Sequence, residues 1–166
     1  GNYEIEKISL KAIAKKGGKL TTKNPGVGTI LGIDYFNIGS LQHINDEVKS
    51  KFNLNQLNHR QSLEVISKEL GLYLKSASQE NLKQGIENLL GEAMMVVTIY
   101  KENLSIVKEH SKINSEIIVS VQDPSNIQNT LLWNNNNELL SLRVKFSRSQ
   151  SYGWSTIKFT SEYKPY

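Results

Sequence analysis

The chain has 166 residues, of which 38% are hydrophobic and 22% are charged, and it contains no cysteine. This length and composition fit one globular domain with generous loops better than an intrinsically disordered chain. The absence of cysteine excludes a disulfide scaffold, thiol catalysis and a zinc site built from thiolates. No stretch approaches the roughly 20 consecutive apolar residues that a membrane-spanning helix needs.

Basic residues outnumber acidic ones by 20 to 16, and two acid-free runs carry the excess. One run extends from Lys7 to Lys23. The other extends from Leu139 to Ser161 and contains two of the three arginines. Arginine can bind a phosphate through two parallel hydrogen bonds, so the C-terminal run indicates binding of a phosphodiester chain. The alternative is a solvated surface that only keeps the protein in solution.

The first 39 residues are rich in lysine and glycine and predict a basic, loop-rich leader. Lysines recur every four residues from Lys7 to Lys15, which indicates a basic amphipathic helix. The glycines from Gly26 to Gly32 do not have the spacing of a nucleotide-binding loop and predict a mobile hinge. Because the chain begins with Gly1 rather than Met, we interpret it as an excised domain or a processed fragment.

Three helices are expected between residues 40 and 91, because apolar side chains recur there at helical spacing. Each pattern follows a residue that can accept an N-cap hydrogen bond; the expected caps are Ser40, Asn58 and Ser78. Gly71 interrupts the second pattern, and Gly91 stands where the third helix should stop.

Strand patterns replace helical ones from residue 93 to residue 162. The runs Thr130–Trp133 and Glu138–Phe146 flank four asparagines and predict a hairpin, because asparagine tolerates the positive φ of a tight turn. Residues 104–109 predict either a hairpin partner or a short helix. The expected fold class is α+β, with N-terminal helices packed on one face of a C-terminal antiparallel sheet. The expected organisation is a leader at 1–39 and a domain at 40–166, with helices at 40–91 and the sheet at 93–162.

Alternation along the last two strands sorts their side chains between two faces. Apolar residues, from Leu140 to Phe146 in one strand together with Ile157 and Phe159 in the other, are expected to face the helices. The outward side chains are Arg143, Lys145, Trp154, Thr156, Lys158 and Thr160. We expect them to form one cationic face without a carboxylate, beside an exposed loop that carries Arg148 and Tyr152.

Such a face suits RNA, because cations and hydroxyls bind phosphate while an aromatic ring stacks on an unpaired base. The expected substrate-binding residues are Arg148, Tyr152, Trp154 and Thr160. Cleavage through the ribose 2′-hydroxyl needs a base, an acid and cations but no metal. We expect His110 as the base, with His59 as the alternative, and Arg143, Lys145, Thr156 and Lys158 as the other catalytic groups. No cofactor and no metal are expected, since the scattered acids form no paired-carboxylate site for Mg²⁺.

A basic leader, a helical half and a C-terminal sheet with a Lys/Arg/Thr face resemble the C-terminal toxin ribonuclease modules of bacterial contact-dependent inhibition proteins and colicins. The resemblance is to the barnase, EndoU, colicin and RelE-like group, and it covers residues 40–166. It implies a secreted or cell-surface-delivered toxin that cleaves tRNA or other RNA in the cytoplasm of a target cell. It also implies a tightly bound acidic immunity protein.

The alternative hypothesis is a non-enzymatic binding module. Its basic sheet face would bind nucleic acid or an acidic protein partner without cleaving it. Both hypotheses predict binding that weakens with salt, and only the first predicts turnover.

Overall fold

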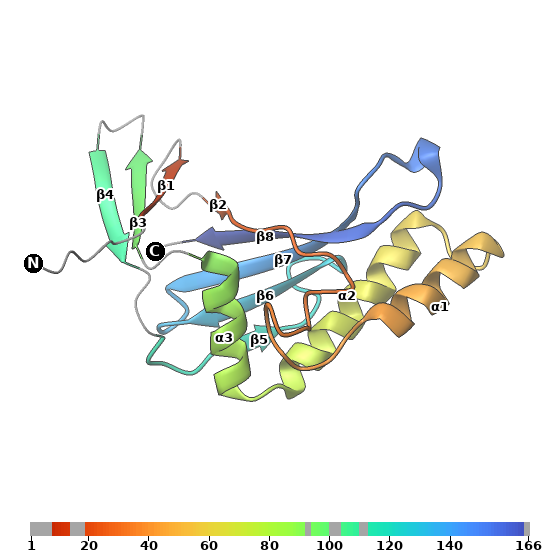
Figure 1. The fold of residues 1–166 in the computed structure, drawn as a ribbon, viewed down its shortest axis with the longest axis horizontal. Helices are drawn as coiled ribbons and strands as arrows, with labels where there is room; N and C mark the ends of the chain where they lie inside the picture. Colours follow the sequence, from red (N-terminus) through yellow and green to blue (C-terminus); the bar gives the residue numbers. More distant parts are fainter. Residues whose placement is uncertain (1–7, 14–18, 92–93, 100–103, 110–112, 165–166) are drawn as a thin grey trace, which may run out of the picture.

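The computed structural model describes residues 8–13, 19–91, 94–99, 104–109 and 113–164. Its described helices precede most of its strands and lie on one face of a five-stranded sheet (Figure 1). The helices are α1 (Gln42–Asn53), α2 (His59–Ser76) and α3 (Gln79–Leu90). The sheet strands are β2 (Leu20–Thr21), β5 (Ile118–Ser120), β6 (Gln128–Trp133), β7 (Glu138–Phe146) and β8 (Ile157–Lys164). Their order is β2-β8-β7-β6-β5 and every neighbouring pair is antiparallel, so the expected α+β class is confirmed.

A second, three-stranded sheet has the order β1-β3-β4. It consists of β1 (Ile8–Ile13), β3 (Met94–Ile99) and β4 (Leu104–Glu109), with β1 parallel to β3 and β4 antiparallel to it. The structure therefore divides the expected single C-terminal sheet into two. Residues 104–109 are the hairpin partner rather than a short helix. The basic helix predicted from the lysine spacing is wrong, because Ile8–Ile13 pairs as a strand with β3; Lys7 and Lys15 lie outside the described residues.

The core forms between α2 and the inner face of the five-stranded sheet. Ile66, Leu70 and Leu74 of α2 are fully buried, and α2 contacts β5, β6 and β7. Leu140, Leu142 and Val144 of β7 are at most 1% exposed, so the alternation predicted for this strand is confirmed. Burial of such side chains is the main favourable term in folding.

Helix α2 runs without a break through Gly71, which the sequence pattern marked as an interruption. A Cβ at this position would lie 2.4 Å from Oδ1 of Asn129, so the glycine lets β6 approach the helix closely. Asn129 is fully buried; its Nδ2 donates to the Ser67 carbonyl at 2.8 Å and its Oδ1 accepts from the Gln122 backbone N–H at 3.0 Å. Every polar atom of that side chain thus has a partner, as burial requires.

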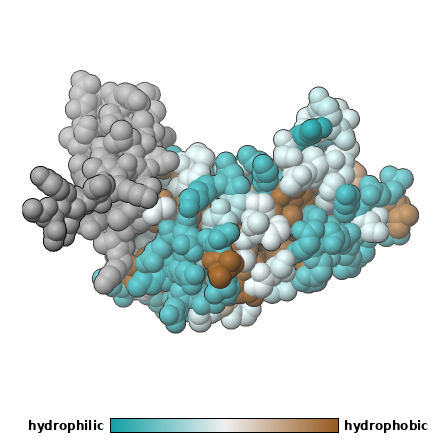
Figure 2. Space-filling view, in the orientation of Figure 1, coloured by the Kyte–Doolittle hydropathy of each residue, from teal (hydrophilic) through white to brown (hydrophobic). Residues whose placement is uncertain are grey.

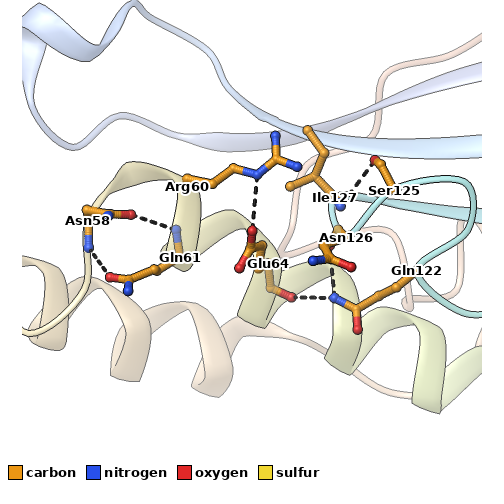
Figure 3. A network of polar contacts seen from close by, with 8 residues as sticks. All are labelled: Asn58, Arg60, Gln61, Glu64, Gln122, Ser125, Asn126 and Ile127. Carbon is orange, nitrogen blue, oxygen red and sulfur yellow. Dashed lines mark hydrogen bonds and ion pairs between the residues drawn. The ribbon is translucent and has the colours of Figure 1, made fainter.

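The expected caps of the second and third helices are confirmed. Asn58 forms a reciprocal capping box with Gln61, and Ser78 accepts from the Asn81 N–H. The cap predicted at Ser40 is wrong: the N-cap of α1 is Leu41, and Ser40, one residue before it, accepts from the Gln42 N–H. Figure 3 shows the capping box together with the contact between α2 and the β5–β6 connection, in which Gln122 donates to the carbonyls of Glu64 and Asn126.

Residues 20–27 form an edge strap along β8. Backbone bonds from Thr22 N–H to Ser161 O, from Phe159 N–H to Pro25 O and from Val27 N–H to Ile157 O continue the β2–β8 pairing. The segment predicted as a hinge follows directly and is a packed turn, in which Ile30 and Leu31 are fully buried. Residues 19–39 therefore fold with the rest of the domain.

The surface over the helices in Figure 2 is largely hydrophilic with isolated apolar patches. None of the helices in the described residues has the length and apolar character that crossing a membrane takes.

Candidate nucleic acid interface

The pairing of β7 with β8 brings the predicted cations together. Lys145 lies directly opposite Lys158, and Arg143 lies opposite Thr160. All three cations are exposed, and no ion pair engages them among the described residues. The helices cover the other face, so the face that carries the cations, here called the open face, is free of helices (Figure 1). The two terminal strands therefore do share one cationic platform.

Polar side chains surround these cations on the open face. The register places Gln128 and Thr160 opposite Arg143 on the two neighbouring strands. Ser141 and Thr130 share this face but are buried, and the Thr130 hydroxyl donates to the Asp123 carbonyl. Hydroxyls and amides of this kind donate to phosphate oxygens. Thr156 also continues this parity and is exposed at the start of β8.

The expectation that the open face lacks a carboxylate is wrong. Glu162 lies opposite Ser141, on the same face as Arg143 and in the diagonal position to it. It forms no ion pair with Arg143 among the described residues. The acid-free run ends at Ser161, one residue before this carboxylate, so the run did not describe the whole face. The Lys145–Lys158 end is the uncompensated part.

Trp154 does not face outward as predicted. Its ring lies 5.4 Å from Phe52 and 5.2 Å from Phe146, measured between centroids, and it packs against the core. These rings and His59 form what we call the aromatic cluster. Alternation failed at Trp154 because β8 begins only at Ile157, so the residue precedes the regular strand. Trp154 is thus partly buried against two other rings rather than standing free on the open face.

His59 belongs to the same cluster. Its ring lies 4.8 Å from Phe52 and 5.2 Å from Phe146, and Nε2 lies 3.1 Å from the carbonyl oxygen of Gly153. Because a carbonyl oxygen only accepts, Nε2 must carry the hydrogen and donate it. His59 therefore ties the first turn of α2 to the connection between β7 and β8. This contact was missed in the sequence, where the helix-start position was the sole signal at His59.

The connection between β7 and β8, here called the tip (Ser147–Thr156), projects from the end of the sheet (Figure 1). Tyr152 is 68% exposed, and the guanidinium carbon of Arg148 lies 5.6 Å from the centre of its ring. A hollow of about 250 Å³ lies in the tip; its lining residues are Ser147, Arg148, Tyr152, Trp154, Ser155 and Thr156. Arg148 and Tyr152, both predicted as binding residues, are thus exposed neighbours.

The remaining candidates can be placed only in part. His110, the expected base, lies outside the described residues. His43, the remaining histidine of the chain and not an expected catalytic group, is exposed on α1. In the described residues no three His, Cys, Asp or Glu side chains cluster as metal ligands.

Similarity to a curated protein bears on the expected function. The chain matches the type II restriction enzyme BsuRI. The sequences are 57% identical over 161 residues, which cover 97% of this chain and 28% of that Bacillus subtilis enzyme. The chain therefore spans just over a quarter of the length of the curated relative. No family model matches, and no solved structure matches.

This match contradicts the expected ribonuclease toxin, because a restriction enzyme is a nuclease of DNA. The expected RNA substrate, the immunity protein and delivery as a secreted toxin are corrected with it. The match gives no support to the non-enzymatic alternative either. The resemblance to toxin modules was one of architecture alone, and an α+β layout is shared by proteins of many functions. The catalytic roles expected of Arg143, Lys145, Thr156, Lys158 and the histidines depended on RNA as the substrate.

Proposed function

We propose that this chain is the part of a type II restriction enzyme that holds duplex DNA against the open face of its five-stranded sheet. The observation that carries the proposal is the cluster formed by Arg143, Lys145 and Lys158, which strand register gathers on one exposed face. The similarity to a type II restriction enzyme is the reason for proposing DNA as the nucleic acid that this face binds. Such a function requires the protein to work in the compartment that holds the DNA.

The Lys145–Lys158 pair supports this proposal independently of the relative. Like charges directly opposite each other on paired strands destabilise a sheet. No described carboxylate forms an ion pair with either lysine. A phosphate backbone supplies the missing negative charge, and displacement of its condensed counterions favours binding.

Duplex DNA also fits the rest of the open face better than RNA does. Trp154 is packed in the aromatic cluster, and Tyr152, the other ring expected to stack on a base, lies on the tip rather than on the open face. Contacts from cations and hydroxyls to a phosphate backbone need no unpaired base, and such contacts are the larger share of protein–DNA hydrogen bonds.

The test is the salt dependence of binding to a fluorescent 30-base-pair duplex, measured by anisotropy. We expect Lys145→Ala and Lys158→Ala each to weaken binding and to reduce the slope of log K against log salt by about 0.9. Lys49→Ala removes the same charge from exposed α1 on the helical side, and we expect it to leave the slope unchanged. Equal slopes for all three variants and the wild type would contradict the proposal.

A further inference from the structure

The tip is an ordered extension of the β7–β8 hairpin. The Ser147 N–H donates to the Thr156 carbonyl at 2.8 Å, and the Arg148 N–H donates to the Ser155 hydroxyl at 3.2 Å. A 3₁₀ turn (Gln150–Tyr152) and Gly153, at φ 72°, close the tip. The Ser147–Thr156 bond extends the paired β7–β8 hairpin by one step, and the residues beyond it form a loop that the 3₁₀ turn closes.

The tip is anchored to the helices. His59 donates to the Gly153 carbonyl, and Trp154 packs on Phe52 and Phe146. Gly153 and Trp154 are therefore fixed, while the neighbouring side chains of Tyr152 and Arg148 are exposed. Exposed polar side chains on a fixed backbone are the arrangement that a precise contact with a ligand requires.

Arg148 is held in position without being neutralised. Its guanidinium lies against the Tyr152 ring, an arrangement that a cation and an aromatic face favour. No acid occurs between Leu139 and Ser161, and no ion pair engages Arg148 among the described residues. Its N–H groups are thus available to an external acceptor.

The tip continues the DNA-binding face. Lys145 precedes Ser147 by two residues, and Lys158 follows Thr156 by two residues. Ser147 and Thr156 both line the hollow beside Arg148, and both continue the parity of the open face. DNA held by the cations would therefore lie next to the tip.

A two-stranded β-ribbon fits the major groove of B-DNA, which is about 12 Å wide. Base edges there present distinct acceptors, and the paired acceptors O6 and N7 of guanine match the donors of one guanidinium. We propose that the tip enters the major groove and that Arg148 is a specificity-determining residue that reads guanine. This inference rests on the proposed function. Tyr152 orients the guanidinium, and the cations of the open face hold the flanking phosphates.

The test separates sequence preference from binding. The chain is used to select duplexes from a random library, and the affinity for the selected duplex is compared with that for the unselected pool. We expect the wild type to enrich a guanine-containing site. Arg148→Lys keeps the charge but loses the paired donors; we expect its preference to fall about 10- to 100-fold and its affinity for the pool to change less than about twofold.

Arg60→Lys is the matched control, because Arg60 is bound to Glu64 on α2 (Figure 3), with Nε 3.1 Å from Oε1. We expect it to select the wild-type site. Enrichment of the wild-type site by Arg148→Lys would overturn the inference, as would salt-dependent binding by the wild type without any enrichment. Failure of the wild type to bind any duplex would instead refute the proposed function, and the inference with it.

Discussion

The two faces of the five-stranded sheet are made by the same strands and do different things. On the face under α2, Leu142 and Val144 are sealed from water, whereas the intervening Arg143 points to the open face. The buried apolar side chains of one face therefore stabilise the fold, whereas the exposed cations of the other face are not part of the hydrophobic core. The difference teaches that adjacent residues of β7 should have separable roles in stability and in DNA binding.

Substitutions of Leu142 and Arg143 give the most direct test of whether the two faces have separate roles. Leu142→Ala leaves a cavity under α2 and should lower the free energy of unfolding by about 3 kcal/mol. Arg143→Ala should lower it by less than about 0.5 kcal/mol and should weaken duplex binding instead. Urea denaturation and anisotropy measure the two effects. A large loss of stability in Arg143→Ala would mean that the open face is part of the structural core.

Lys145→Glu should have opposite effects on stability and on DNA binding at one position of the open face. Reversal of this charge converts the like-charged Lys145–Lys158 pair into an opposite-charged pair, so unfolding should cost about 0.5 kcal/mol more. The same change places a negative charge against the DNA backbone, and we expect roughly tenfold weaker binding, about 1.4 kcal/mol. Thermal unfolding at low salt measures the expected gain in stability, and a duplex titration measures the expected loss of affinity. Unchanged affinity with raised stability would count against a DNA contact at this position.

His59→Phe probes the link between the helices and the tip. The ring can still pack with Phe52 and Phe146, but the hydrogen bond to the Gly153 carbonyl is lost, at a cost of about 1 kcal/mol. We expect weaker preference for the selected duplex and the wild-type salt slope, because the cations of the open face are untouched. Affinity for the random pool provides the internal control. A changed slope would show that His59 acts on the open face rather than through the tip.

The sequence predicted best where local chemistry decides the conformation. The N-caps Asn58 and Ser78 and the positive φ values of Asn134, Asn135 and Asn136 depend on nearby backbone alone. The alternation of β7 was equally clear, since half of that strand is buried. These features fixed the expected fold class and the common position of Arg143, Lys145 and Lys158.

Long-range partners account for what the sequence did not reveal. The segment Ile8–Ile13 became a strand through pairing with β3, and Trp154 turned inward because Phe52 and Phe146 lie there. Glu162 joined the open face through its register with Ser141. The predicted function was the largest error. A cationic face binds the phosphate backbone of both DNA and RNA, so the charge pattern does not indicate which of the two sugars the ligand contains.

The edge strap has a consequence for crowding on DNA. Proteins that gather along one polymer meet each other at high local concentration, and exposed strand edges then invite copies to join into aggregates. Here β8 has β7 on one side and the strap on the other, so the most cationic hairpin offers no unpaired edge to a second copy. The opposite border of the sheet is β5, only three residues long. Edge-to-edge pairing through the cationic β7–β8 hairpin itself is therefore blocked.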